Sequence, residues 1–318
     1  MDVALSHRPR VTVFAPDPLL SVAVEACGTE DELHLHAGGQ GVWVARMAAE
    51  MGAAPVLCSF LGGETGEMLM PLLNRIPGEV RITATAGSTG SYVVDRRNGE
   101  RKLLASALRP APQRHEIDDL VSATVAAALG SSLLVLCNPY PADGLPDDVY
   151  ARISADVKRA GIPVLVDLSS PRLDRTLPSG PDLVKLNDWE LAAYVYGPVD
   201  GPRLLEAASA LRDAGAVTVA VTRADAPILV VSEHDEPFEI VPPPFTSGYR
   251  EGCGDAMMGA VAAAWARGLT PRQALVIGSA AGSVNFLRRG LGSGRRATIE
   301  ELAASIDTRP ASLGVTTG

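Results

Sequence analysis

The chain has 318 residues, 47% of them hydrophobic, so it can bury a large core in one α/β domain or in two smaller domains. Its formal net charge of -9 gives no broad cationic surface, which argues against nucleic acid and anionic membranes as partners. The four cysteines lack the spacing of a zinc or redox motif, and we find no signal peptide or membrane span, so we expect a cytoplasmic protein.

Short apolar runs alternate with helical patterns along the sequence. Four β-branched runs with little polar alternation predict buried parallel strands at residues 11–14, 133–136, 164–166 and 217–221. Apolar residues at helical spacing predict helices at residues 40–52, 117–129, 147–160, 202–214 and 255–267. The alternating order predicts a doubly wound α/β fold, in which helices cover both faces of a mainly parallel sheet.

A different pattern occupies residues 79–106, where polar and apolar residues alternate. The alternating stretches are residues 81–85, 91–95 and 101–104, and Asn98-Gly99 is a typical hairpin turn. These stretches predict a small β lid over one end of the sheet. We expect the lid to come from about residues 12–40 and 80–106 of a single domain that spans residues 1–318. Because such strands present an exposed face, a homodimer formed through the lid is a further expectation.

The turn before the helix at residues 255–267 has the composition of an anion site. Gly252, Cys253 and Gly254 precede Asp255, where the helix is predicted to start. Backbone N–H groups at a helix start converge on one point, and the helix dipole favours negative charge there. The three amides would stabilise a phosphoryl group in transfer, while Asp255 accepts the proton of an attacking hydroxyl. Alternatively, Asp255 only caps the helix and the glycines only form a tight turn.

Together with this turn, three further regions in the same order resemble the ribokinase/PfkB family of carbohydrate kinases, with the phosphofructokinase-like branch (1-phosphofructokinase and tagatose-6-phosphate kinase) most similar. They are residues 38–66, 181–191 and 280–285, and the resemblance covers nearly the whole chain. It implies a ribokinase-like three-layer αβα sandwich with a β lid over the acceptor. It also implies ATP as the phosphoryl donor and Mg²⁺ bridging the nucleotide phosphates.

The resemblance carries functional roles over to individual residues. Catalysis falls to Asp255 and to the amides of the turn before it. On the nucleotide side the expected residues are Lys185, Asn187, Glu190, Thr222, Arg223 and Asn285, with Glu190 also next to the metal. On the acceptor side they are Ser21, Gly38, Gly39, Gln40, Trp43, Tyr92 and Asp255. Each also has a purely structural interpretation, such as a capping box formed by Asn187 and Glu190 or glycines that only turn the chain.

Several positions depart from the family pattern, mostly on the acceptor side. Ser21 stands where the family has an aspartate that binds sugar hydroxyls, and Trp43 replaces an asparagine. Gly90 follows Thr89 where phosphosugar kinases of this branch tend to have an arginine that clamps the substrate phosphate. We therefore expect an unphosphorylated or unusual polyol, such as a sugar, nucleoside or cyclitol, stacked on Trp43 and Tyr92. Fructose phosphate and tagatose phosphate are less favoured.

The sequence leaves two main functional hypotheses. The first is a kinase that transfers the γ-phosphoryl group of ATP to a hydroxyl of a small polyol. The alternative is a catalytically silent ligand-binding or regulatory member of the same fold, suggested by the altered positions Ser21, Gln40 and Trp43 and by Ala224 in a turn where the family often has glycine. A nicotinamide-dependent Rossmann enzyme is disfavoured, because no G-x-G-x-x-G motif follows the first predicted strand.

Overall fold

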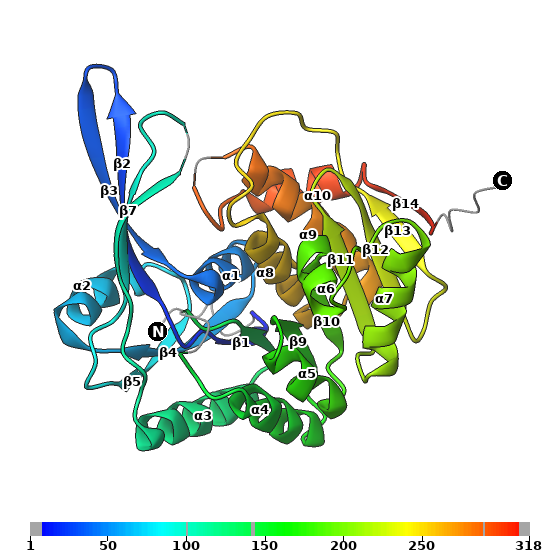
Figure 1. Cartoon of the computed structure of the whole chain (residues 1–318), viewed down its shortest axis with the longest axis horizontal. Coiled ribbons are helices and arrows are strands. Elements are labelled where there is room, and N and C mark those ends of the chain that lie inside the picture. The colour runs from blue at the N-terminus through cyan, green and yellow to red at the C-terminus, as the bar shows by residue number, and fades with distance from the viewer. Residues whose placement is uncertain (1–7, 100, 141–143, 289, 312–318) are drawn as a thin grey trace.

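The computed structural model describes residues 8–99, 101–140, 144–288 and 290–311, so the first and last residues of the chain lie outside the description (Figure 1). Its main sheet contains β1 (Arg10–Phe14), β4 (Ala54–Leu61), β5 (Glu79–Ala84), β8 (Leu133–Cys137), β9 (Val164–Asp167), β10 (Leu183–Asn187), β11 (Thr218–Arg223), β12 (Ala226–Ser232), β13 (Phe238–Val241) and β14 (Asp307–Pro310). The strand order is β14-β13-β12-β11-β10-β9-β8-β1-β4-β5. The strands from β11 to β5 run parallel, whereas β12, β13 and β14 extend the sheet antiparallel.

Helices cover both faces of this sheet. The described helices are α1 (Gln40–Glu50), α2 (Gly63–Leu73), α3 (Arg114–Ala128), α4 (Asp148–Arg159), α5 (Arg172–Thr176), α6 (Asp188–Tyr194), α7 (Pro202–Asp213), α8 (Cys253–Ala266), α9 (Pro271–Phe286) and α10 (Arg296–Ala303). Val11 and Val13 of β1 pack in one core with α1, α8 and α9, whereas Phe14 packs in another with α3, α4 and α7. Successive residues of a strand face opposite layers, so Val13 and Phe14 place apolar side chains on both faces of β1. The predicted three-layer fold with a mainly parallel sheet is confirmed.

The lid is a separate sheet of four described strands, β2 (Leu19–Cys27), β3 (Glu30–Gly38), β6 (Ser91–Asp95) and β7 (Lys102–Ala107), in the order β3-β2-β6-β7. The β6–β7 pair is antiparallel, as the hairpin signal predicts. The structure differs from the expectation at residues 81–85, because β5 pairs in parallel with β4 at the edge of the main sheet. Val80 and Ile82 pack against the core there, which explains the alternating pattern without a place in the lid.

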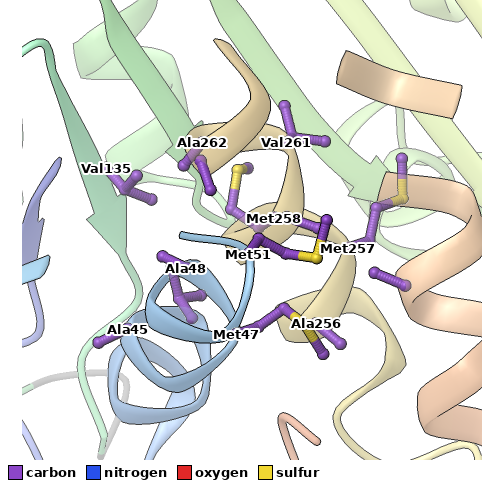
Figure 2. Close-up of a cluster of buried hydrophobic side chains, with 14 of the residues drawn as sticks. Ala45, Met47, Ala48, Met51, Val135, Ala256, Met257, Met258, Val261 and Ala262 are labelled. Carbon is purple, nitrogen blue, oxygen red and sulfur yellow. The ribbon is translucent and has the colours of Figure 1, made fainter. Parts of the chain in front are cut away.

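The close packing of α1 on α8 fixes the position of Gln40, at the start of α1, relative to the glycine-rich turn at the start of α8. Figure 2 shows Met47 and Met51 of α1 beside Met257 and Met258 of α8 in one buried apolar cluster. At the crossing, a Cβ on Gly259 would lie 2.4 Å from the backbone oxygen of Val44, so only glycine permits this approach. The starts of α1 and α8 are thereby held in a fixed relation.

No helix in the described ranges combines the length and apolar character needed to span a bilayer.

Candidate active site

The candidate site lies at the carboxyl ends of the parallel strands, where the sheet topology changes direction. From β1 the chain adds β4 and β5 on one side, whereas β8, β9, β10 and β11 follow on the other. Asp17 follows β1, Asn138 follows β8, and the Gln40 side chain at the start of α1 accepts a hydrogen bond from the Asn138 amide at 2.7 Å. In open α/β sheets, ligands bind at such a switch point. The topology therefore points to the same region as the sequence motifs.

A cavity of about 290 Å³, here called the lid cavity, lies between the lid and this sheet edge. Of the expected acceptor residues, Gly39, Gln40, Trp43 and Tyr92 line it. Its other walls come from Ala15, Asp17, Leu19, Gly41, Arg101, Leu103, Asn138, Pro139, Tyr140 and Glu251. Ser21 and Gly38 instead line a smaller neighbouring cavity of about 60 Å³. Aromatic rings and hydroxyl-binding groups together suit a polyol ring.

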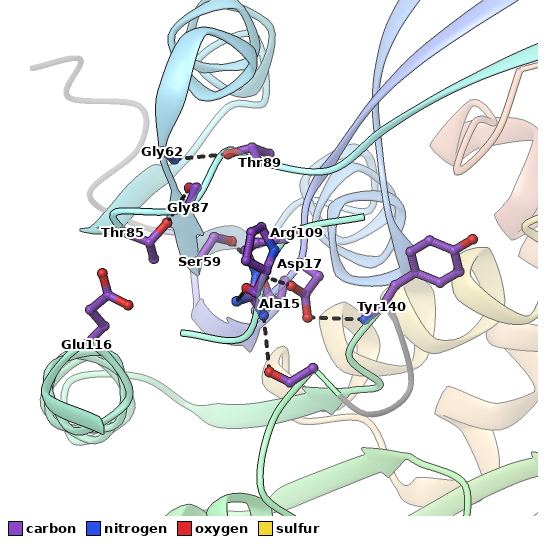
Figure 3. A network of polar contacts seen from close by, with 12 residues as sticks. Ala15, Asp17, Ser59, Gly62, Thr85, Gly87, Thr89, Arg109, Glu116 and Tyr140 are labelled. Carbon is purple, nitrogen blue, oxygen red and sulfur yellow. Dashed lines mark hydrogen bonds and ion pairs between the residues drawn. The ribbon is translucent and has the colours of Figure 1, made fainter. Parts of the chain in front are cut away.

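Asp17 is the buried acid of the lid cavity, and the sequence motifs did not single it out. Arg109 donates to its carboxylate at 2.6 Å, and the backbone amide of Tyr140 donates at 3.1 Å (Figure 3). The Asp17 and Arg109 side chains are only 2% and 3% exposed, and burial raises the pKa of Asp17 against the opposing effect of Arg109. Asp17 therefore fixes the Tyr140 segment beside the lid cavity and has one carboxylate edge near the acceptor space.

A second cavity of about 370 Å³, here called the α8–α9 cavity, opens on the other side of the glycine-rich turn. Of the residues expected on the nucleotide side, Lys185, Asn187, Thr222 and Arg223 line it, together with Cys253 and Gly254 of the turn. Its remaining walls include Trp189, Asp225, Phe245, Arg250, Met257, Ser279, Ser283 and Phe286. Arg223 is also ion-paired with Glu239 at 2.7 Å, so its guanidinium is held at the cavity wall.

The glycine-rich turn has the geometry of an anion site. Gly252 is the N-cap of α8 with φ 76°, a left-handed conformation that favours glycine. A Cβ on Gly254 would lie 2.8 Å from the Lys185 Nζ, so the missing side chain lets the ammonium reach the turn. The first amides of an α-helix have no acceptor within the helix. The Cys253 amide already donates to the Arg250 backbone oxygen at 3.4 Å, so the anion site is formed by the next amides of α8 together with the Lys185 ammonium.

Asp255 lies between the two cavities and does not act as the helix cap. The N-cap is Gly252, and its position shows no side-chain capping bond. The carboxylate of Asp255 instead interacts with Gln40, which lines the lid cavity, and with Lys185, which lines the α8–α9 cavity. Desolvation and the nearby Asp167 raise the pKa of Asp255 to about 7, although Lys185 and Gln40 oppose the shift. A carboxylate with this pKa is well suited to act as a general base near neutral pH.

Lys185 links the turn to a carboxylate that the sequence motifs missed. Its Nζ donates to Asp167 Oδ2 at 2.6 Å, and the two side chains are only 7% and 3% exposed. Burial tends to lower the pKa of Lys185, but Asp167, Asp255 and Glu190 outweigh burial and raise it. The ammonium therefore stays charged. Asp167 ends β9 directly after the predicted run 164–166, and an acid at the end of a buried strand is a signal that could have identified it.

Glu190 and Asn187 form a capping box at the start of α6. Asn187 Oδ1 accepts from the Glu190 amide, and Glu190 Oε2 accepts from the Asn187 amide, both at 2.8 Å. Burial and the neighbouring Asp167 raise the pKa of Glu190, so a cation beside these acids would be favourable. In the described part of the chain, no group of three or more His, Cys, Asp or Glu side chains is arranged to hold a metal ion. The described side chains by themselves therefore do not complete a metal site.

Asn285 has a structural position, outside the residues that line either cavity. It is fully buried, and its Nδ2 donates to the Glu251 backbone oxygen at 3.0 Å. Its Oδ1 accepts from the Ser293 amide at 3.2 Å. Asn285 therefore anchors the chain that leads into the glycine-rich turn, which differs from the direct nucleotide contact expected from the sequence.

Comparison with known proteins agrees with this geometry. Residues 16–297 match the model of the pfkB family of carbohydrate kinases. The chain is 29% identical over 315 residues to the ATP-dependent 6-phosphofructokinase isozyme 2 of Mycobacterium tuberculosis, covering 93% of this chain and 91% of that protein. It is 30% identical over 239 residues to the 1-phosphofructokinase of Rhodobacter capsulatus, covering 70% and 71%. The structure of phosphofructokinase-2 from Escherichia coli with substrates and products has 25% identity and a TM-score of 0.79, covering 93% and 99%.

Proposed function

We propose, from the premise that the chain belongs to the pfkB family of carbohydrate kinases, that Asp255 is the general base of an ATP-dependent sugar kinase. The position of Asp255 carries this proposal, because its carboxylate connects Gln40 of the lid cavity with Lys185 of the α8–α9 cavity. The catalytically silent alternative has no observation in its favour among the described residues or the comparisons. The match to the family model confirms the resemblance noted from the sequence. The roles of the individual site residues are proposed.

In the proposed reaction, the acceptor sits in the lid cavity and the nucleotide in the α8–α9 cavity. Asp255 accepts the proton of the acceptor hydroxyl as its oxygen bonds to the γ-phosphorus and the bond to the ADP oxygen breaks. Amides at the start of α8 and the Lys185 ammonium stabilise the charge on the phosphoryl oxygens. Positioning and electrostatics carry most of the rate enhancement, since phosphoryl transfer needs little covalent help from the protein.

The donor groups at the carboxyl ends of β9, β10 and β11 suit Mg²⁺ and a nucleotide. Glu190 and Asp167 offer carboxylate oxygens, the ligand type that Mg²⁺ prefers, and Asn187 and Thr222 lie at the paired ends of β10 and β11. When bound with the nucleotide, Mg²⁺ would neutralise charge on the phosphates. Asn187, Thr222 and Arg223 would face those phosphates from the cavity wall.

The lid cavity favours a neutral polyol as the acceptor. The charged residues of its walls, Asp17, Glu251 and Arg101, are all in ion pairs, and Asp17 is paired with Arg109 behind the wall, so no wall charge lacks a counter-charge. Gly90 stands at the position of the usual phosphate-clamping arginine, and a side chain there would start 2.7 Å from Leu19 Cδ2, so Leu19 would have to move to admit one. A sugar phosphate is the second candidate, favoured by the names of the phosphofructokinase relatives.

The acceptor class can be tested by measuring ADP release with ATP and Mg²⁺ across a panel of compounds. The panel contains fructose, ribose, adenosine, myo-inositol, fructose 6-phosphate and fructose 1-phosphate, and each product is checked by ³¹P NMR. We expect a neutral polyol to give the highest kcat/KM. A preference of tenfold or more for a sugar phosphate would replace the neutral acceptor with the second candidate. ATP binding without turnover of any sugar or polyol in a wider panel would argue against the kinase assignment.

We also propose that the lid forms a homodimer. Leu33 and Leu35 share one face of β3 and are 66% and 48% exposed, which is unusual for an isolated sheet. Light scattering should give the mass of two chains for the wild type and of one chain for the Leu33→Ser/Leu35→Ser variant. Leu129→Ser, which changes a leucine that is 58% exposed beyond α3, should leave the mass unchanged. A monomeric wild type at micromolar concentration would rule the dimer out.

A further inference from the structure

Glu251 joins the lid to the glycine-rich turn. It directly precedes Gly252, and its carboxylate is ion-paired with Arg96 at the end of β6 and with Arg101 at the start of β7, the latter at 3.1 Å. The Glu251 and Arg96 side chains are only 26% and 15% exposed. Partly buried ion pairs are screened less by salt than exposed ones. One carboxylate therefore contacts both sides of the β6–β7 turn.

The connection continues into the protein on one side of Glu251 and into the lid on the other. On the protein side, the backbone oxygen of Glu251 accepts from the buried Asn285, which fixes the residue at the start of the turn. On the lid side, the Arg101 guanidinium lies 5.2 Å from the centroid of the Tyr92 ring. Arg101, Tyr92 and Glu251 all line the lid cavity. A displacement of Arg101 would therefore shift Glu251 and the backbone amides that follow it.

The neighbouring arginine on the same hairpin has different partners. Arg97 pairs with Asp31 at 3.0 Å and with Asp95 at 2.8 Å, so its ion pairs stay within the lid. The lid is also held by continuous strand pairing from β3 through β2 and β6 to β7. The strand pairing of the lid sheet thus does not involve the Glu251 ion pairs. Their distinctive effect is to fix the lid relative to the turn.

We propose that Glu251 is a positioning residue for phosphoryl transfer, holding the lid hairpin so that the acceptor in the lid cavity is aligned with Asp255 and the amides of the turn. This inference rests on the proposed kinase function. A hairpin held at the turn also keeps water from the γ-phosphorus. When the hairpin is released, a water oxygen can bond to that phosphorus while the bond to ADP breaks, giving ADP and inorganic phosphate instead of a phosphorylated acceptor.

The first test measures hydrogen–deuterium exchange of the ligand-free protein, which does not depend on activity. Glu251→Gln and Arg96→Gln are each expected to raise amide exchange in residues 91–99 and 248–255 several-fold. The double variant should exchange no faster than Glu251→Gln, because that substitution already removes the ion pair with Arg96. Arg97→Gln is the matched control and should leave residues 248–255 unchanged. Unchanged exchange in residues 248–255 of Glu251→Gln would overturn the proposal.

The second test measures kinetics with the acceptor that the panel identifies and, separately, with MgATP alone. In Glu251→Gln we expect kcat to fall about tenfold, the KM for ATP to stay within twofold, and the share of ADP released as inorganic phosphate to rise. Glu251→Asp, which keeps the charge, should recover part of the rate. A normal kcat with no added phosphate release would overturn the positioning role. If no acceptor is turned over, the kinase proposal fails, whereas the exchange experiment still decides whether Glu251 couples the lid to the turn.

Discussion

Asp255→Asn is expected to lower kcat by about 10³-fold, within the range for loss of a general base, while the Kd of MgATP changes little. The amide cannot accept the acceptor proton, but it keeps the size of the side chain and can still contact Gln40. The Lys185 ammonium and the start of α8 remain in place to bind the phosphates. Rates with the preferred acceptor and nucleotide titration would measure the two effects separately.

The matched control is Asp148→Asn, because Asp148 is an exposed acid in the first turn of α4 and does not line either cavity. It should retain the wild-type kcat. A kcat for Asp255→Asn within tenfold of the wild type would remove Asp255 from the role of base. A large loss of MgATP affinity together with kcat would instead indicate that Asp255 acts mainly in nucleotide binding.

The same substitution should stabilise the fold at higher pH. Because the folded-state pKa of Asp255 is raised from 3.8 to about 7, its contribution to stability is lost as pH rises through 7. Asparagine does not ionise and avoids that loss. Since Asp255 is partly exposed, we expect Asp255→Asn to gain about 1 kcal/mol relative to wild type between pH 5 and pH 8, or roughly 2 °C in Tm. A Tm difference independent of pH would contradict the raised pKa.

Lys185→Met is expected to destabilise the protein by about 3–5 kcal/mol and to abolish activity. The substitution leaves the Asp167 carboxylate, 3% exposed, without its ammonium partner beside Glu190 and Asp255. An uncompensated buried charge is far more destabilising than the absence of the whole pair. Activity is lost as well, because the substitution removes the ammonium that lies next to Gly254 in the proposed phosphoryl site.

Urea unfolding followed by circular dichroism tests this electrostatic explanation. Adding Asp167→Asn to Lys185→Met should recover at least half of the lost free energy of unfolding without restoring activity. Arg114→Gln removes an exposed pair with Asp118, in which Arg114 is 97% exposed, and should change stability by less than about 0.5 kcal/mol. If the double variant is no more stable than Lys185→Met, packing and not the buried charge explains the loss.

The sequence predicted the strands and helices correctly where their own residues indicate what surrounds them. The buried runs that became β1, β8, β9 and β11 are apolar on both faces, so period and composition identified them. Residues 81–85 show the limit of this reasoning. An edge strand of the main sheet and a lid strand have the same alternating pattern, and only the parallel pairing of β5 with β4 distinguishes them.

The sequence predicted those residues of the candidate site that lie in short motifs. Cys253, Gly254 and Lys185 line one cavity, and each lies in a short segment of the turn or the strand end that the sequence identifies. Asp17 and Asp167 were missed because their roles depend on partners distant in the sequence. Asp17 pairs with a residue 92 positions away, and no local spacing specifies such a contact.

The most direct test of the account is the pH dependence of kcat/KM for the preferred acceptor, measured at saturating MgATP with the wild type and Asp255→Asn. A base must be ionised to accept a proton, so the wild-type rate should rise with pH through an apparent pKa of about 7 and then level off. The residual rate of Asp255→Asn should lack this rise. A wild-type profile that stays flat between pH 5.5 and pH 8.5, or an identical rise in Asp255→Asn, would contradict the assignment of Asp255 as the base.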